Sequence, residues 1–554
     1  MDIDDKLLKA NMNQILLNIN EKSINLPILN KNIDDIYVSL YLLDPEKEPH
    51  KYLCLSCIFG AFLGDSIGSC CEFSSESPEN HLDIFRIQGI FNPGEVTDDS
   101  EMAMSAAFAY IDILNEKPEI IQNLIYYYFG VWRGSGPKDI GGATTNALRF
   151  WNENQSILET EFKNKFVRLT NWDSLANGFL MRISTFIVYY YYTHLQTIYD
   201  TIQNFFNNDK PEDDLPDTII NLYLDIYKES YKNVEITHPN YENGISSAVF
   251  TLMTFVGMVT KDAKRVYSIF YRISKSQKFI ECHKDKALKF YADLVKDKYS
   301  KIISDVNNNI PFSVVGQMGY YMHGFKLCIY FLHKYPDMAE NKDKDLYYDI
   351  MCEVCDKGGD TDTNCAIVGA MLGPLIGFKN FKSDIFETFI KFVPYNRCQF
   401  TSASMYVYVN YLEKKLLNNP NTKKVEIKSD LKNEEQKKIK GENPELLGVE
   451  GKKEDQNEEK KTAEIQEEGI KNNIKDEKKI ENNEENKGET KETTIPSETG
   501  VTTEGVNKGE NKNLKEKEKE HNNIEKPKSE NKEEGFKYTA YKLILQFLNE
   551  KMEL

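Results

Sequence analysis

The chain has 554 residues and a net charge of −18, from 87 Asp and Glu against 69 Lys and Arg. This acidic balance argues against a nucleic-acid-binding surface, which needs basic side chains at the phosphates. The first five residues are acidic where a secretory signal would be basic, and the most apolar run, residues 179–192, is too short to cross a bilayer. We therefore expect a cytoplasmic protein that binds neither nucleic acid nor a membrane.

The composition divides the chain into a foldable part and a tail. All three Trp and all ten Cys precede residue 400, whereas residues 421–534 contain no aromatic side chain. A segment of that composition buries too little apolar surface to offset its conformational entropy. We predict a helical extension over residues 1–50, a compact domain over 51–415 and a disordered linker over 421–535. Residues 536–554 are expected to form an amphipathic helix that docks on the domain or on a partner protein.

Apolar residues recur through the compact domain at the i, i+3 and i+4 spacing of helices. In chain order, this spacing predicts helices over residues 53–69, 100–114, 120–129, 143–152, 178–199, 219–231, 243–260, 284–296, 319–334, 346–355 and 365–376. No hairpin pattern of alternating residues around Asn-Gly or Asp-Gly stands out. The expected fold class is therefore all-α, with polar motifs on loops at helix N-termini.

Two acidic clusters lie far apart in the sequence: Thr97-Asp98-Asp99-Ser100 and Gly358-Gly359-Asp360-Thr361-Asp362-Thr363. They offer only carboxylate and hydroxyl oxygens, which suit Mg²⁺, Mn²⁺ or Ca²⁺ and suit zinc poorly. Neighbouring carboxylates repel each other without a cation, and the two glycines let the backbone turn sharply. These features favour a metal site.

Each cluster also has a simpler interpretation as a helix N-cap. Asp, Ser and Thr are preferred at helix starts, and Asp98 with Glu101 matches a capping box. A cap uses one side-chain oxygen, so the additional carboxylate in each cluster is the feature that favours metal binding.

Two Cys-x-x-Cys pairs, at residues 54 and 57 and at residues 352 and 355, have the spacing of half a zinc site. Both lie in apolar helical sequence without the turn residues of a zinc knuckle. We therefore predict buried thiols, because a free Cys behaves as a small hydrophobic residue.

The other polar turns are ambiguous when taken one at a time, because the same residues build ordinary turns and caps. Their order along the chain is more informative: GDSIGSCCEF, GEVTDDSEMAM, DIGGATTNALRF, NGFLMRIS, THPN and GGDTDTNCAIVGAMLGPLIG. This succession resembles the ADP-ribosylglycohydrolase family, in the branch of dinitrogenase-reductase-activating glycohydrolase, over roughly residues 51 to 400. The resemblance implies a compact single-domain helical fold.

The resemblance also implies the activity and the partner. The expected reaction is hydrolysis of the glycosidic bond between ADP-ribose and a protein side chain, with arginine favoured over serine, or of a small ADP-ribose derivative. The implied partner is an ADP-ribosylated protein or that derivative, bound by a monomer. Two Mg²⁺ or Mn²⁺ ions are the implied cofactors.

The site residues follow from the family's motifs, position by position. The implied metal ligands are Thr97, Asp98, Asp99, Asp360, Asp362 and Thr363. The catalytic candidates are Glu72, Asp139 and Asp362, and the first two stay unranked as proton-transfer groups. The implied substrate contacts are Gly141, Gly142, Asn177, Gly178 and His238, and Asp65 has a supporting role.

Departures from the family pattern affect the expected substrate preference more than the chemistry. Residues 261–311 diverge and are interpreted as an added helical insertion, and the double Cys at residues 70 and 71 is unusual. Two other functions stay open. A catalytically silent ADP-ribose-binding module is disfavoured by the intact acidic clusters, whereas a crystallin-like scaffold is consistent with the long tail.

Overall fold

The computed structural model describes residues 26–72, 91–114, 118–151, 164–207, 214–392 and 401–417. Within these ranges every regular element is a helix, and one isolated antiparallel bridge joins Ala176 to Tyr320. The expected all-α fold is therefore confirmed. The predicted linker over residues 421–535 and the predicted helix over 536–554 lie outside the described residues, as do residues 1–25.

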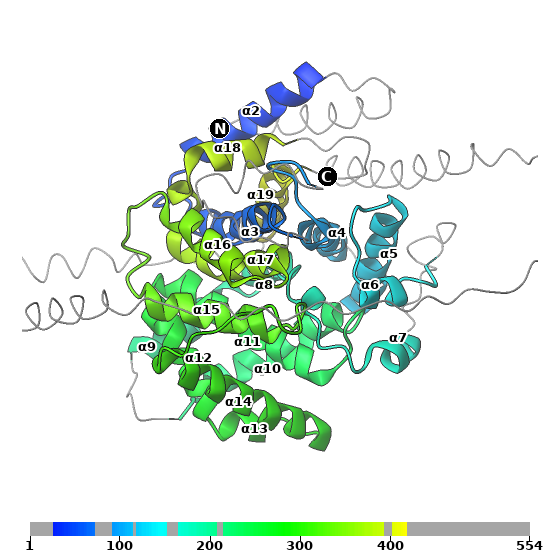
Figure 1. The fold of residues 1–554 in the computed structure, drawn as a ribbon, viewed down its shortest axis with the longest axis vertical. Helices are drawn as coiled ribbons and strands as arrows, with labels where there is room; N and C mark the ends of the chain where they lie inside the picture. Colours follow the sequence, from blue (N-terminus) through cyan, green and yellow to red (C-terminus); the bar gives the residue numbers. More distant parts are fainter. Residues whose placement is uncertain are drawn as a thin grey trace, which may run out of the picture. The chain divides into compact units, whose positions relative to one another are not determined.

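The helices are shown in Figure 1. In chain order they are α2 (Leu26–Leu42), α3 (Pro49–Gly68), α4 (Asp98–Ile113), α5 (Ile121–Gly134), α6 (Gly142–Ala147), α7 (Asn164–Asn171), α8 (Ser184–Thr193), α9 (Leu195–Asn207), α10 (Asp217–Val234), α11 (Tyr241–Thr260), α12 (Ala263–Lys275), α13 (Lys278–Glu281), α14 (Lys286–Asn307), α15 (Met322–Lys334), α16 (Leu346–Lys357), α17 (Thr361–Ile376), α18 (Ser383–Lys391) and α19 (Ser404–Leu416). Three short 3₁₀ turns are η2 (Pro118–Ile120), η4 (Asn177–Phe179) and η5 (Phe378–Asn380).

Helices α3 and α17 form the centre of the fold and pack along each other through glycines. A Cβ atom on Gly60 would lie 2.2 Å from the carbonyl oxygen of Gly369, and one on Gly64 would lie 2.3 Å from that of Cys365. Only glycine permits this approach of two backbones. The result is a pair of helices, far apart in sequence, that lie side by side (Figure 1).

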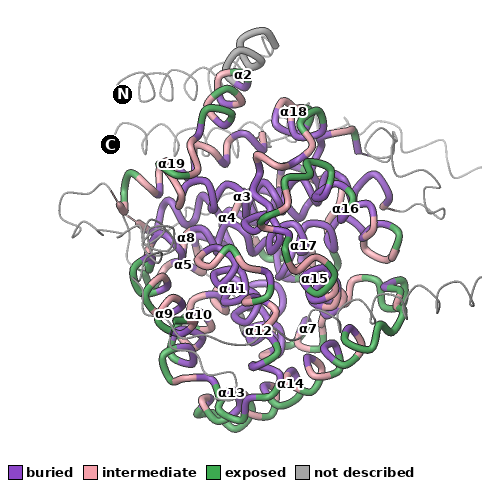
Figure 2. The backbone as a smooth tube through the Cα atoms, turned by 90° about the vertical axis from the view of Figure 1, so that its left-hand side faces the viewer, coloured by how far each residue is buried: buried purple, intermediate pink, exposed green. Residues whose placement is uncertain are grey.

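The remaining helices differ in how far they are buried. Helix α11 is long and apolar enough to cross a membrane, but 89% of that stretch is buried inside the fold. Helices α13 and α14, by contrast, expose residues along their outer sides (Figure 2). Helix α11 therefore serves here as a core helix, and α14 as a covering one.

The segment interpreted as an insertion is helical, as expected, and belongs to the packed core. Helix α12 buries Val266, Ile269 and Phe270, and the ring of Phe270 lies 6.1 Å from that of Phe325 on α15. The predicted helix over residues 284–296 is α14, which extends eleven residues further, from 296 to 307. Whether this segment is an insertion relative to the family stays a prediction.

Three predicted helices differ from the structure. The helix predicted over 178–199 is divided into η4, α8 and α9. The buried Arg182 donates to the carbonyl oxygen of Gly178 at 2.6 Å and holds the turn before α8, and α8 ends at His194. The helix predicted over 143–152 ends at Ala147, after which the Leu148 carbonyl accepts a hydrogen bond from Arg133. The helix predicted over 319–334 begins only at Met322, because the preceding residues pair with residues 175–177.

Candidate functional site

The first acidic cluster lies at the start of α4, where side chains from two helices fix the backbone. Thr97 is the N-cap, and its hydroxyl contacts both the backbone N–H and the carboxylate of Asp99. Asp65, from the last turn of α3, accepts hydrogen bonds from the N–H groups of Thr97 and Ser100 and from the Ser100 hydroxyl. The cap is thus complete without Asp98.

The capping box predicted from Asp98 and Glu101 is wrong. The cap residue is Thr97, one position earlier, and Glu101 instead accepts a hydrogen bond of 2.6 Å from the indole N–H of Trp132. Asp98 is consequently available for another role.

The second acidic cluster lies at the start of α17. Gly358 and Gly359 have φ angles of +74° and +80°, and a Cβ on Gly359 would lie 2.4 Å from the Val314 carbonyl oxygen. These two positions therefore require glycine. The Thr361 hydroxyl donates to the carbonyl oxygen of Gly68 at 2.9 Å, which joins the start of α17 to the end of α3.

Folding brings the two clusters together. Thr363 Oγ1 lies 3.4 Å from Asp99 Oδ2, across 264 residues of sequence. Carboxylate oxygens of Asp65, Asp99 and Asp362 lie within 4.8 Å of one another, as do those of Glu72, Asp360 and Asp362. Asp362 belongs to both groups, so they are neighbouring parts of one site.

We refer to the carboxylates of this site as the acidic wall: Asp65, Glu72, Asp98, Asp99, Asp360 and Asp362. Burial, followed by repulsion from neighbouring carboxylates, raises the pKa values of Asp98, Asp99 and Asp362 well above their usual range. Burial likewise raises the pKa of Glu72 to about 8 and that of Asp65 to about 6. Such shifts mark carboxylates whose negative charge is not offset by the surrounding residues.

The acidic wall faces a cavity of about 770 Å³. Its lining contains six acidic residues (Glu72, Asp98, Asp139, Asp356, Asp360 and Asp362) and, among the residues that the structure describes, no Lys, Arg or aromatic residue. Asp65, Thr97 and Asp99 lie behind the lining. The volume falls within the range of about 300–1,000 Å³ that is usual for small-molecule sites.

A second part of the cavity lining, which we call the amide wall, consists of Asn177, Gly178, His238 and Gly319 and adjoins the acidic wall at Asp360. The Asn177 side-chain amide donates to Asp360 at 2.8 Å, and its backbone N–H donates to the Gly319 carbonyl oxygen at 2.8 Å. Nδ1 of His238 forms a hydrogen bond with the Thr237 hydroxyl. Burial lowers the pKa of His238 to about 3. His238 is therefore a neutral ring at physiological pH.

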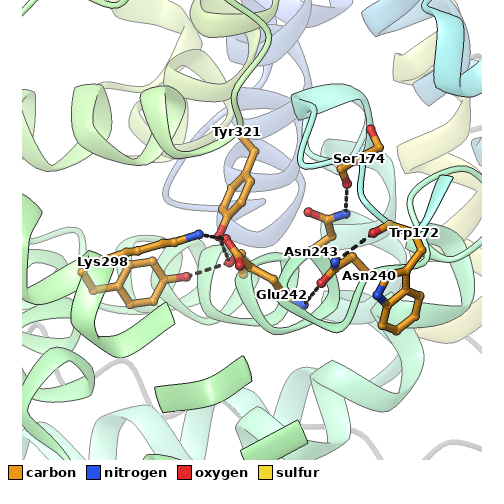
Figure 3. Close-up of polar contacts among 9 residues, drawn as sticks. Trp172, Ser174, Asn240, Glu242, Asn243, Lys298 and Tyr321 are labelled. Atoms are coloured by element: carbon orange, nitrogen blue, oxygen red, sulfur yellow. Dashed lines mark hydrogen bonds and ion pairs between the residues drawn. The ribbon is translucent and has the colours of Figure 1, made fainter. Parts of the chain in front are cut away.

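Buried polar residues support the amide wall from behind. The Arg182 guanidinium contacts the Gly178 carbonyl, Asn233 and the Thr237 hydroxyl, and its side chain is fully buried. At the start of α11, Asn240 and Asn243 donate to the carbonyl oxygens of Trp172 and Ser174 (Figure 3). These bonds hold the loop that leads into Asn177.

A second support comes from α14. The Glu242 side chain is 1% exposed and accepts a hydrogen bond of 2.8 Å from the Tyr321 hydroxyl. It also forms an ion pair with Lys298 (Figure 3). The Tyr321 backbone N–H donates in turn to the Leu175 carbonyl oxygen. Lys298 of α14, within the segment interpreted as an insertion, thereby helps to position the amide wall.

The other sequence-predicted residues also reach the site. Asp139, Gly141, Gly142 and Thr363 line the cavity, and a Cβ on either glycine would meet no atom within 4 Å. Their backbone is therefore open to a ligand. The roles given to them as catalytic, substrate or metal residues stay predictions.

The four cysteines of the two Cys-x-x-Cys pairs are buried thiols, as predicted. Cys54, Cys57, Cys352 and Cys355 are all buried within helices, and the groups of described residues that are able to hold a metal contain no Cys. The zinc interpretation is thus disfavoured.

Several lining residues were not predicted from the sequence: Cys71, Met181, Val315, Met318, Gly319, Cys355 and Asp356. Asp65 was expected to have only a supporting role, but it also belongs to one of the carboxylate groups. In the sequence, only the two glycines at residues 316 and 319 indicated that Met318 and Gly319 lie in a loop that is able to approach a ligand.

Comparison with known proteins decides the family. The family model described as ADP-ribosylglycohydrolase matches residues 50–389. The chain belongs to the ADP-ribosylglycohydrolase family. A relative from Acanthamoeba polyphaga mimivirus, provisionally named an ADP-ribosyl glycohydrolase, is 27% identical over 331 residues, which cover 57% of this chain and 85% of the relative.

A solved structure named an ADP-ribosylglycohydrolase-related protein complex aligns with a TM-score of 0.40 and 14% identity. The alignment covers 66% of this chain and 98% of that one. Membership of the family supports a hydrolase that acts on linkages to ADP-ribose, and the two carboxylate groups lie within the matched residues.

Proposed function

We propose that this chain hydrolyses the glycosidic bond that joins ADP-ribose to a protein side chain, with arginine preferred over serine, and that it depends on two Mg²⁺ or Mn²⁺ ions. One observation carries the proposal: two carboxylate groups share Asp362 at the wall of a cavity sized for a nucleotide ligand. Asp362 would thus offer a carboxylate oxygen to cations held by either group.

The residues fit divalent cations in three respects. Their oxygen donors are the type that Mg²⁺ and Mn²⁺ prefer. Two buried carboxylate oxygens, Glu72 Oε2 and Asp99 Oδ1, have no hydrogen-bond partner among the described residues. A buried oxygen of this kind is costly unless a ligand satisfies it. Finally, the lining has no described Lys or Arg to attract an anionic pyrophosphate, so bound cations would supply the positive charge.

Of the family's ligand set, Asp99, Asp360 and Asp362 belong to the two carboxylate groups, to which the geometry adds Asp65 and Glu72. We keep Asp98 and Thr363 as further ligands from the family motif; Asp98 lies outside both groups but lines the cavity, and Thr363 contacts Asp99. Thr97 completes the family's ligand set, although its hydroxyl is already bonded to Asp99. Bound cations would supply Lewis acidity and orient the ribose hydroxyls.

The chain's own residues would handle binding and proton transfer. The open backbone at Gly141 and Gly142 and the amide wall would contact the pyrophosphate and ribose. Val315 and Met318, which are 56% and 58% exposed at the cavity, would contact the nucleobase. Glu72 and Asp139, which both line the cavity, are the candidate groups for proton transfer to the leaving side chain.

The direct test is a release assay with ADP-ribosyl-arginine and ADP-ribosyl-serine peptides, with and without Mg²⁺ or Mn²⁺. We expect cation-dependent release of ADP-ribose, faster from arginine, and its loss in Asp98→Ala and Asp362→Ala. Release that is equally fast after chelation would contradict the cation dependence. Binding of ADP-ribose without release would instead identify a silent binding module, and neither binding nor release by folded protein would favour a scaffold.

A further inference from the structure

Apolar side chains form an exposed patch where the chain turns from α6 to α7. Phe150 and Leu169 are 48% and 78% exposed. The ring of Phe166, which lies three residues before Leu169 on α7, is 4.6 Å from that of Phe150 in an edge-to-face arrangement. The Arg149 guanidinium lies over both rings, at 5.6 Å from each centroid. We refer to Arg149, Phe150, Phe166 and Leu169 as the corner patch.

The residues on both sides of Phe150 are anchored, so its exposure is a fixed feature of the fold. Trp151, the next residue, packs against α5, because a Cβ on Gly130 would lie 2.1 Å from its ring. The Leu148 carbonyl oxygen accepts a hydrogen bond of 2.7 Å from Arg133. Phe150 therefore projects from a segment that the protein holds in place.

The corner patch is continuous with the lining of the cavity. Helix α6 begins in that lining, at Gly142 and Ala143, and is six residues long, so it spans about 9 Å. Asn171 lies two residues after Leu169, and its side-chain amide donates to the carbonyl oxygen of Ala143 at 2.8 Å. Both helices of the corner thus join the patch to the cavity.

The charge of the corner patch is opposite to that of the cavity. The described lining contains six acidic residues and no Lys or Arg. Arg168, the other arginine of α7, pairs with Glu235 at 2.9 Å, so Arg149 supplies the positive charge of the patch. Aromatic and arginine side chains are enriched in protein interfaces and among the residues that contribute most to binding.

A protein substrate places its ADP-ribose in the cavity, while its polypeptide stays outside, on surface that adjoins the lining. We propose that the corner patch binds this polypeptide: an apolar side chain packs on Phe150, Phe166 and Leu169, and an acidic side chain pairs with Arg149. The length of α6 corresponds to about three extended residues, so these side chains lie about three residues from the modified arginine. This inference rests on the proposed function and adds the part of the protein substrate that is recognised.

The test uses the full-length protein and two peptides, each with one ADP-ribosyl-arginine flanked about three residues away by Leu and Glu or by Gly and Gln. Free ADP-ribosyl-arginine is the small substrate. We expect wild-type kcat/KM to be about tenfold higher for the Leu/Glu peptide than for the Gly/Gln peptide, through a lower KM. Phe150→Ala with Leu169→Ala should abolish this advantage and leave turnover of free ADP-ribosyl-arginine unchanged. Arg149→Glu should also lower kcat/KM for the Leu/Glu peptide.

Phe290→Ala with Leu294→Ala is the matched control, because it removes the same two types of exposed side chain from α14. These residues are 65% and 37% exposed, and α14 contributes no residue to the described lining. The control should keep the tenfold advantage of the Leu/Glu peptide. Both double variants should keep the wild-type melting temperature, since they change surface side chains.

The outcomes separate the two proposals. Turnover of free ADP-ribosyl-arginine with equal wild-type kcat/KM for the two peptides would overturn the docking role and leave the proposed function intact. A loss for all three substrates with a lower melting temperature in Phe150→Ala with Leu169→Ala would assign the patch to the fold and also overturn it. So would a wild-type dimer that this variant dissociates in sedimentation, which would identify an interface between two copies. No turnover of any substrate by the wild-type protein would contradict the proposed function itself, and the inference with it.

Discussion

The acidic wall and the amide wall face the same cavity but satisfy their polar atoms in different ways. On the acidic wall, Glu72 Oε2 and Asp99 Oδ1 are buried without a partner among the described residues, and burial raises the carboxyl pKa values. On the amide wall, Asn177 and His238 each have a hydrogen-bond partner within the protein. One wall is therefore complete as folded, and the other is completed by a ligand.

This difference suggests that the amide wall positions the substrate, whereas the acidic wall carries the reactive groups. A fully bonded wall fixes distances before the substrate arrives, which lowers the entropic cost of correct orientation. A wall of unpaired carboxylates is unstable by itself and gains stability from a cation. The two walls should consequently respond differently to mutation, to pH and to metal.

The largest effect is expected from the shared carboxylate. Asp362→Ala removes an oxygen donor from both groups at once, and we expect kcat/KM to fall by about a thousandfold, equivalent to about 4 kcal/mol. Steady-state kinetics measure the loss, and calorimetric titration with Mn²⁺ measures the binding. The control is Asp349→Ala on exposed α16 surface. Wild-type Mn²⁺ stoichiometry in Asp362→Ala would contradict the role of Asp362 as a ligand common to both groups.

The walls should also impose opposite pH dependences on stability. On the acidic wall, the pKa of Glu72 is raised from 4.5 to about 8. The folded state therefore holds a proton that the unfolded state has lost, and stability falls as pH rises through this interval. On the amide wall, the pKa of His238 is lowered from 6.5 to about 3. The unfolded state takes up that proton first, so stability falls as pH drops below 6.5.

Each proton of difference changes the free energy of unfolding by about 1.4 kcal/mol per pH unit. Melting temperatures recorded from pH 3 to pH 8, with and without Mg²⁺, measure both the fall in stability at high pH (the alkaline limb) and the fall at low pH (the acid limb). We expect Mg²⁺ to flatten the alkaline limb, because the cation offsets the carboxylate charges, and to leave the acid limb in place. Flattening of both limbs would show that the walls are not independent.

The ion pair between Lys298 and Glu242, which supports the amide wall from outside the cavity, can be removed by mutation. Lys298→Met leaves the buried Glu242 carboxylate without its ion-pair partner, and we expect a loss of about 2 kcal/mol in unfolding free energy. Because the Tyr321 contact then loosens, KM should rise several-fold with little change in kcat. Lys298→Arg keeps the charge and should restore both values in urea unfolding and kinetics. A fall in kcat alone would contradict a positioning role.

A smaller effect is expected from a single methyl group on the amide wall. In Gly178→Ala the new Cβ would lie 2.9 Å from His238 Cε1, so the ring must shift, at a cost of about 1 kcal/mol. Gly316→Ala is the control, because a Cβ there meets no atom within 4 Å. Thermal unfolding of the two variants compares them directly, and equal melting temperatures would show that the ring moves freely.

The smallest effect is expected outside both walls. Every described cavity residue lies between Cys71 and Thr363, and the family match ends at residue 389. Deleting residues 421–554 should therefore leave kcat/KM unchanged within experimental error. A large loss in the release assay would show that the predicted terminal helix completes the catalytic domain.

The sequence predicted the helices well where their boundaries depend on local patterns. Helix α17 follows two glycines and an acidic cap, and its predicted core matches the structure. The turn before α8, within the predicted 178–199 helix, is held by Arg182, whose partners Asn233 and Thr237 lie more than fifty residues away. Local periodicity contains no information on such contacts.

The site shows the same limit. The acidic clusters were identifiable because their residue types and spacing match both a chemistry and a family motif. The contribution of Asp65 was underestimated, since its hydrogen bonds to α4 span at least 32 residues.

The glycine contact between α3 and α17 extends to the site itself. A Cβ on Gly68 would lie 2.4 Å from the Thr361 carbonyl oxygen and 2.6 Å from the Cα of Asp362. The separation of Asp65 from Asp362 is therefore set by the missing side chains of a helix pair. A related protein that kept every carboxylate but had Ala in place of Gly68 would retain the acidic motifs. Its two helices would be forced apart, and the carboxylates would no longer lie together. Loss of activity in such a lineage would be invisible to any inspection of its acidic residues.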